Sequence, residues 1–211
     1  SSVWELTQDV DADLDGAPSW AEVEAPNSGD GDANGVQDSD EASVASFYGE
    51  SGTPAGAASV ATKGMALAQV TMALAPLEGN CTRINNAHAL PAITLPRDNA
   101  RGGAPSHFGN FGVLRFEIPD CRAATVDVTV HGADFSDVDW SWRNFGPLVP
   151  GVADSMGWYG FAGAVKVAAD TWRLTLRAGE QGSYRDDPEN ILFVGAPGFV
   201  DIQIFGGGFE D

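Results

Sequence analysis

The chain has 211 residues, of which 30 are acidic and 11 are basic, giving a formal net charge of −19. So negative a charge argues against binding to nucleic acid or to anionic lipid, because both need clustered Lys and Arg. A hydrophobic content of 43%, with 6 Trp and 11 Phe, is enough for a buried core and excludes a wholly disordered chain. No apolar run reaches about 18 residues, so no membrane span is predicted.

The acidic residues are concentrated in the N-terminal quarter of the chain. Residues 1–50 carry 13 acidic side chains and no Lys or Arg, whereas residues 51–211 carry 17 acidic and all 11 basic ones. A solvated acidic tail is one interpretation of such a segment. The regular spacing of its acids favours a different one.

Residues 30–41 follow the spacing of an EF-hand-type calcium loop. Oxygen-bearing side chains stand at the first, third, fifth, ninth and twelfth positions, and Gly35 takes the sixth. Calcium needs six to eight hard oxygen ligands, and glycine permits the sharp turn at the sixth position. The predicted ligands of this second loop are Asp30, Asp32, Asn34, the Val36 carbonyl, Asp38 and Glu41.

The same frame begins 19 residues earlier, with Gly16 at its sixth position. Two complete frames in tandem are hard to obtain from composition alone, so both are predicted to bind Ca²⁺. Pro18 and Pro26 leave little room for EF-hand helices, and the loops therefore resemble the compact repeats of thrombospondin type 3 or dockerin modules. Without metal, the carboxylates should repel one another and loosen the segment. The predicted ligands of this first loop are Asp11, Asp13, Asp15, the Ala17 carbonyl, Ser19 and Glu22.

The remainder, residues 43–211, is predicted to form an antiparallel β-sandwich domain after a calcium-binding segment at 1–42. Apolar and polar residues alternate at 125–130 and 171–176, which is typical of sheets with one solvated face. Many short strands with frequent turn residues favour a sandwich. The run 65–74 also contains good helix formers, so a helix is the alternative there. The predicted strands are 43–47, 59–63, 65–74, 111–118, 124–130, 138–142, 164–168, 171–176, 191–194 and 200–205.

The only two cysteines are Cys81 and Cys121. An even count in an acidic, β-rich chain predicts one disulfide and an oxidising compartment outside the cytoplasm. Two free buried thiols are the alternative.

No catalytic constellation is found in the sequence, so the chain is predicted not to be an enzyme. It has no nucleophile elbow, no zinc-protease helix motif and no phosphate-binding loop, and its three histidines are far apart. Two acidic groups could bind a sugar or a cation, but turn residues are the simpler interpretation of both. They are Asp134, Asp137 and Asp139 beside Trp140 and Trp142, and Asp186, Asp187 and Glu189 around Pro188.

Several motifs in order resemble a known family. Asn-Gly-Val-Gln-Asp at 34–38 is followed by Trp-Ser-Trp-Arg-Asn-Phe-Gly-Pro at 140–147 and by Trp-Arg-Leu-Thr-Leu-Arg at 172–177. This order resembles the choice-of-anchor U β-domain of bacterial surface proteins, which follows calcium repeats. The resemblance spans roughly residues 30–200 and implies a secreted, surface-associated, non-catalytic module. At 17–19 the chain lacks the acid usual in such repeats, so the first site is expected to be the weaker.

The function predicted from these features is that of an extracellular, calcium-stabilised structural module for surface display, adhesion or assembly. Its partners would be other surface proteins or copies of itself. Residues 1–6 (Ser-Ser-Val-Trp-Glu-Leu) could add as a strand to a neighbouring copy. A carbohydrate-binding module is the alternative, with sugar stacking on exposed Trp140, Trp142, Trp158 and Tyr159.

Overall fold

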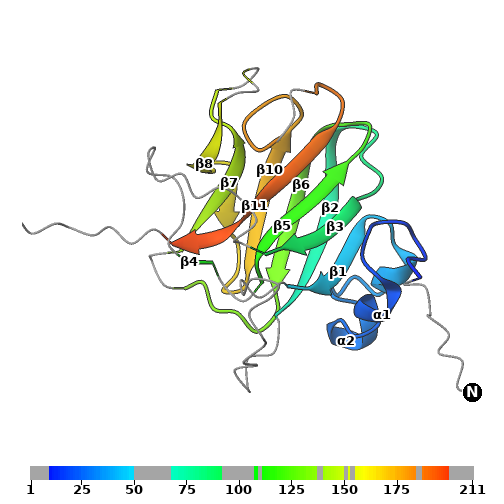
Figure 1. The fold of residues 1–211 in the computed structure, drawn as a ribbon. Coiled ribbons are helices and arrows are strands. Elements are labelled where there is room, and N and C mark those ends of the chain that lie inside the picture. Colours follow the sequence, from blue (N-terminus) through cyan, green and yellow to red (C-terminus); the bar gives the residue numbers. More distant parts are fainter. Residues whose placement is uncertain are drawn as a thin grey trace, which may run out of the picture.

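A computed structural model describes residues 10–49, 68–91, 107–108, 111–136, 140–149, 152, 155–183 and 187–199. Its strands form two antiparallel sheets that enclose a common core, as the sequence predicted (Figure 1). The first sheet has the order β1 (Val44–Tyr48), β2 (Gln69–Gly79), β6 (Cys121–Val130), β10 (Thr171–Arg177) and β9 (Ala164–Lys166). The second has the order β3 (Asn85–Leu90), β5 (Val113–Ile118), β11 (Ile191–Phe199), β7 (Ser141–Pro147) and β8 (Met156–Gly160), with β4 (His107–Phe108) also pairing with β11.

The core lies between the inner faces of the two sheets. The predicted alternation is confirmed in β6, where Val126, Val128 and Val130 are fully buried, and in β10, where Leu174 and Leu176 are. Aromatic side chains fill the space between the sheets, because large rings bury the most apolar area. The main ring contacts are Phe116 with Phe193, Trp142 with Trp172, and Phe135 with Trp140.

Most of the predicted strands that fall in the described residues are present. The ambiguous run at 65–74 is a strand, β2, from Gln69 onward, and it continues to Gly79. The strand predicted at 138–142 instead begins at Ser141 and runs to Pro147. Strands β3 and β8 were not predicted, since β3 contains few β-branched residues and β8 contains two glycines. The predicted strands at 59–63 and 200–205 lie outside the described residues.

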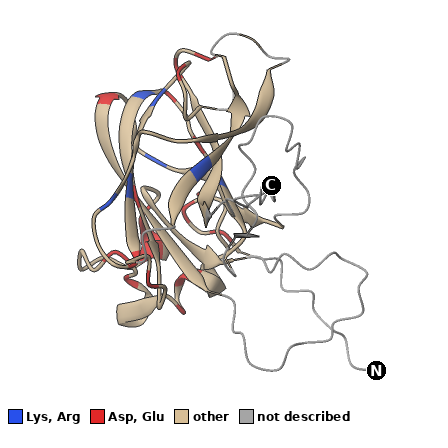
Figure 2. Ribbon diagram, turned by 90° about the vertical axis from the view of Figure 1, so that its left-hand side faces the viewer, with Lys and Arg blue, Asp and Glu red and all other residues tan. Residues whose placement is uncertain are grey.

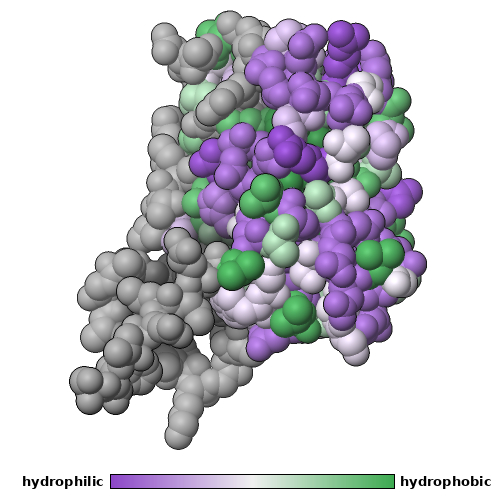
Figure 3. Space-filling model, turned by 90° about the vertical axis from the view of Figure 1, so that its right-hand side faces the viewer, coloured by the Kyte–Doolittle hydropathy of each residue, from purple (hydrophilic) through white to green (hydrophobic). Residues whose placement is uncertain are grey.

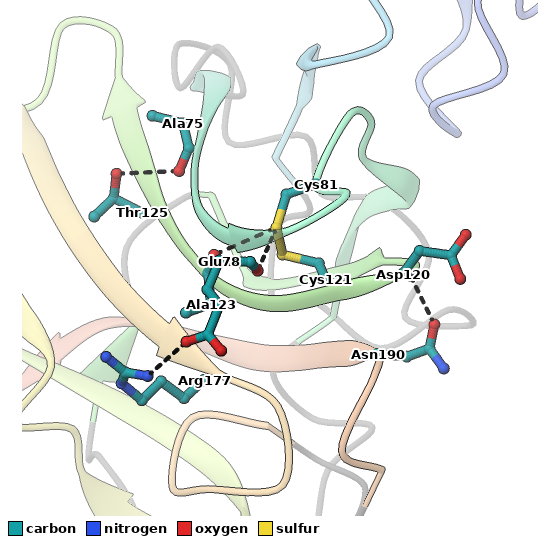
Figure 4. Close-up of a disulfide and its surroundings, with 9 residues drawn as sticks. All are labelled: Ala75, Glu78, Cys81, Asp120, Cys121, Ala123, Thr125, Arg177 and Asn190. Carbon is teal, nitrogen blue, oxygen red and sulfur yellow. Dashed lines mark hydrogen bonds and ion pairs between the residues drawn. A yellow bond between two sulfur atoms is a disulfide. The ribbon is translucent and has the colours of Figure 1, made fainter.

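The predicted disulfide between Cys81 and Cys121 is present, with the two Cα atoms 4.6 Å apart (Figure 4). It joins the chain just after β2 to the first residue of β6, at the end of the ladder where Gly79 pairs with Cys121. An ion pair of 3.6 Å between Glu78 and Arg177 lies beside it. The covalent link therefore fastens one end of the β2–β6 pair.

Residues 10–43 form the acidic segment, which packs against the first sheet next to β1 and also contacts β3. It contains two four-residue helical turns, α1 (Ser19–Glu22) and α2 (Pro26–Gly29), and a 3₁₀ turn, η1 (Asp38–Asp40). The four residues 44–47 of β1 are all buried, although successive side chains of a strand point to opposite faces. The outer face of β1 is therefore covered by the acidic segment.

No helix in the described part of the chain is long and apolar enough to cross a membrane.

Candidate metal centre

The two acidic loops predicted from the sequence share one backbone structure. In each, the carboxylate at the first position accepts a hydrogen bond from the glycine at the sixth, Asp11 from Gly16 at 3.0 Å and Asp30 from Gly35 at 2.9 Å. Each loop also has left-handed backbone at its fourth and sixth positions, where φ lies between roughly +60° and +105°. These residues are Leu14 (67°), Gly16 (103°), Ala33 (62°) and Gly35 (97°).

Two further hydrogen bonds recur at equivalent positions. The side chain at the ninth position accepts the backbone N–H of the second, and the side chain at the fifth accepts that of the seventh. A repeat in four backbone features at a constant spacing is a property of the fold and not only of the composition. The bonds are Ala12 to Ser19 at 3.1 Å, Gly31 to Asp38 at 2.9 Å, Ala17 to Asp15 at 2.6 Å and Val36 to Asn34 at 2.8 Å.

Carboxylate oxygens converge in both loops. One oxygen each from Asp11, Asp13 and Asp15 lie within 4.8 Å of one another. The same holds for Asp30, Asp32 and Asp38. Figure 2 shows the resulting concentration of acidic residues beside the two short helices, in a segment that contains no Lys or Arg. Like charges this close repel unless protons or a cation neutralise them.

The first loop buries its charge most deeply. Asp15 and Glu22 are fully buried, and both oxygens of Glu22 and Oδ2 of Asp15 have no hydrogen-bond partner among the described residues. Burial, with a smaller contribution from the charges of Asp15 and Asp13, raises the pKa of Glu22 to about 9. Burial likewise raises the pKa of Asp15 to about 8 and that of Asp13 to about 6. Ionised groups in such a place need a positive partner.

The second loop satisfies more of its own charge. The amide Nδ2 of Asn34 donates to Asp32 at 3.1 Å and to Glu41 at 2.7 Å, and Glu41 also accepts from Ser43 at 3.3 Å. Asp38 is fully buried but hydrogen-bonded to Gly31. Burial raises the pKa of both Asp32 and Asp38.

The two loops are electrostatically coupled. The charge of Asp38, in the second loop, adds to the raised pKa values of Asp15 and Glu22 in the first. Of the residues predicted to ligate through their carbonyls, Ala17 lies in the sandwich core, whereas the side chain of Val36 is exposed. The twelve predicted ligands thus belong to two loops that share one backbone structure and influence each other's charge.

The other acidic groups singled out in the sequence form turns where they are described. Asp134 accepts the backbone N–H of Ser136 at 2.9 Å, and Asp187 accepts those of Glu189 and Asn190. Asp137, Asp139 and Asp186 lie outside the described residues.

The aromatic platform predicted for a sugar is not formed as expected, because Trp142 and Trp158 are buried. Trp140 packs against Phe135, with ring centroids 5.2 Å apart, and the Tyr159 hydroxyl accepts the backbone N–H of Gly182 at 3.0 Å. These rings, in β7, in β8 and just before β7, therefore serve mainly in packing.

Sequence reasoning missed the residues that support the loops from the sandwich. Ser46 of β1 donates a hydrogen bond of 2.5 Å to Asp38, and the Ala87 N–H of β3 donates to the Asp15 carbonyl at 2.9 Å. Ala87 is far from both loops in the sequence, and Ser46 follows the last position of the second loop by five residues, outside the loop pattern. No local signal could have identified them.

In comparisons with known proteins, no family model, curated protein or solved structure matches the chain.

Proposed function

We propose that residues 11–41 bind two calcium ions and that the chain is a non-enzymatic, extracellular structural module stabilised by them. Its roles would be surface display, adhesion or assembly. The donors are carboxylate, amide and hydroxyl oxygens, which suit a hard cation such as calcium. The disulfide agrees with an oxidising compartment.

One observation carries the proposal: Glu22, at the twelfth position of the first loop, is fully buried with both oxygens lacking a hydrogen-bond partner among the described residues. In an EF-hand-type loop the twelfth residue closes the coordination shell with two oxygens. Burying a carboxylate beside three aspartates costs free energy in the absence of a cation. A bound ion would convert that cost into stabilisation of the folded chain.

Calorimetric titration of the metal-free full chain with calcium tests the proposal. Two binding events are expected at up to about millimolar calcium. The pair Asp11→Asn and Asp13→Asn should remove one event, and the pair Asp30→Asn and Asp32→Asn the other. Asp134→Asn, in an exposed turn, is the control and should retain both. Absence of heat and of any rise in melting temperature would contradict the proposal.

Assembly through residues 1–6 is a further part of this proposed function, and those residues lie outside the described ones. The described sheets end at β1 and β9 in one case and at β3 and β8 in the other, and edge strands are where another strand can add. Light scattering of a chain lacking residues 1–8 tests it. An assembly that keeps its mass without these residues would rule out strand donation by them.

Carbohydrate binding is a second candidate, at a different place from that predicted. Trp20 is 52% exposed and stacks on Tyr48, with centroids 5.9 Å apart and planes 17° apart. Both rings line a groove of about 290 Å³ between α1, β1 and β3, together with Pro18 and His88. Loss of glycan binding in Trp20→Ala but not in Trp140→Ala would support this candidate. A glycan array that shows no binding to the wild-type chain would rule out carbohydrate binding.

A further inference from the structure

A buried row of hydroxyl groups connects the second loop to the sandwich. Ser46 Oγ donates to Asp38 Oδ2 at 2.5 Å, Ser46 Oγ lies 2.6 Å from Thr71 Oγ1, and Thr71 Oγ1 lies 2.8 Å from His131 Nε2. Asp38, Ser46 and Thr71 are each at most 1% exposed. Ser46 and Thr71 face each other across the β1–β2 ladder, and His131 directly follows β6.

The direction of these hydrogen bonds follows from counting protons. An ionised carboxylate only accepts, so Ser46 must donate its single hydroxyl proton to Asp38. Thr71 must then donate its own proton to Ser46. The ring of His131 must therefore donate from Nε2. Asp38 is ionised when it binds a cation. Every hydrogen bond in the row then points the same way, with each donor on the His131 side and each acceptor on the Asp38 side.

Gly31 closes this row from the other side. Its N–H donates to both oxygens of Asp38, at 2.9 and 3.1 Å. A Cβ at this position would lie 2.3 Å from Thr71 Oγ1 and 2.9 Å from Ser46 Oγ, so no larger residue fits without displacing the row. With Ser46, these bonds take three of about four lone-pair directions of the carboxylate, which leaves one for a cation.

We infer that Ser46, Thr71 and His131 are positioning residues for the second calcium loop, and that calcium bound there fixes His131 as the Nε2–H tautomer. The inference rests on the proposed function. Groups that hydrogen-bond to a metal ligand orient it and raise its affinity for the metal, although they do not touch the ion. Metal binding at the loop and the packing of β1 on β2 are thus one linked event, because the same hydroxyl groups take part in both.

The test is a calcium titration followed by NMR on the full chain. The Gly35 and Gly16 amides report separately on the second and first loops, since each donates to the first-position carboxylate of its own loop. Ser46→Ala should weaken calcium binding at the second loop by about tenfold or more, and Thr71→Val by a smaller factor. Thr71→Ser keeps the hydroxyl and should bind as the wild type does. Calcium binding at the first loop should change less than at the second in Ser46→Ala and Thr71→Val.

If the Gly35 amide reports the same calcium affinity in the wild type, Ser46→Ala and Thr71→Val, the inference is overturned. The ring nitrogen shifts of His131 in the calcium-loaded wild type give a second readout that depends on no variant folding. Protonation at Nε2 is expected, and a neutral ring protonated only at Nδ1 would overturn the inference. If neither glycine amide of the wild type responds to calcium, the proposed function itself has failed, and the two failures are therefore distinguishable.

Discussion

The two acidic loops have the same backbone but balance their charge differently. In the first, Asp15 and Glu22 are buried with oxygens that have no hydrogen-bond partner among the described residues. In the second, Asn34 links two carboxylates and Asp38 is held by Gly31 and Ser46.

The face on which the acidic segment lies is mostly polar, with apolar side chains scattered singly (Figure 3).

The difference shows that a spacing pattern predicts which oxygens converge, but not how deeply the fold buries them. Sequence spacing favoured the second loop as the stronger site, because its ninth position is acidic. The burial of Glu22 indicates that the first loop has more stability to gain from a cation. Four experiments, two of them on matched positions, can break or sharpen this comparison.

The largest expected contrast is between Glu22→Gln and Glu41→Gln. In calcium, both should lower the free energy of unfolding, because each removes a proposed ligand. In chelator, Glu22→Gln should raise it by about 1–3 kcal/mol, since it removes a buried carboxyl group that must take up a proton when the metal-free chain folds. Glu41 is half-buried and hydrogen-bonded to Asn34, so Glu41→Gln should change little in chelator. Chemical denaturation measures the free energy of unfolding of both variants in calcium and in chelator. Equal effects of the two variants in chelator would contradict the contrast.

Gly16→Ala and Gly35→Ala form the next pair. Both glycines have left-handed backbone, which costs another residue about 1–2 kcal/mol. A Cβ at Gly16 would also lie 2.5 Å from the Ala87 nitrogen, whereas nothing lies within 4 Å of one at Gly35. Gly16→Ala should therefore cost about 1–3 kcal/mol more. Thermal melts in calcium measure the difference. Similar melting temperatures would show that the β3 backbone at Ala87 can shift to make room for a Cβ at position 16.

The metal-free protein should lose stability as the pH rises from about 5 to about 9. The folded-state pKa values of Asp15, about 8, and of Glu22, about 9, lie far above those of an unfolded chain, so the folded state binds more protons in this window. Stability is therefore greatest at the acidic end and falls until the folded groups ionise. Melting temperatures in a chelator across this range measure the slope.

Two variants locate the origin of that slope. Combining Asp15→Asn with Glu22→Gln should flatten it, whereas Asp32→Asn in the second loop should leave most of it. In calcium the trend should reverse, because the ion binds the ionised ligands. A slope that survives the double variant would place its origin outside the first loop.

The smallest expected effect is that of Ser19→Ala at the ninth position of the first loop. It removes the acceptor of the Ala12 N–H, a bond at the surface that water can replace, so the cost should be about 0.5–1 kcal/mol in chelator. Calcium affinity should fall only modestly if the other oxygens of the loop hold the ion. A loss as large as that in Glu22→Gln would assign Ser19 a direct ligand role.

The sequence predicted those parts of the fold whose signal is local. Alternation identified β6 and β10, and the loop spacing identified residues that the fold brings together, such as Asp11 with Asp15. Strand β8 was missed because Met-Gly-Trp-Tyr-Gly has no alternating pattern, and its pairing with β7 makes it a strand.

What surrounds the loops could not be predicted. Ser46 lies 25 residues from Thr71, and Thr71 lies 60 residues from His131, so only tertiary structure brings them together. The same holds for the covering of Glu22, because a spacing pattern contains no information about the burial of its members.

The strands β2 and β6 are held at their two ends by chemically unrelated means. At one end is the disulfide, next to the pair Gly79 and Cys121. At the other end, where Val70 pairs with Val130, the Thr71 side chain contacts His131. A reducing agent would break the first, and under the proposed function a chelator would empty the loop that the second adjoins. Loss of either one alone therefore leaves the opposite end of this strand pair held.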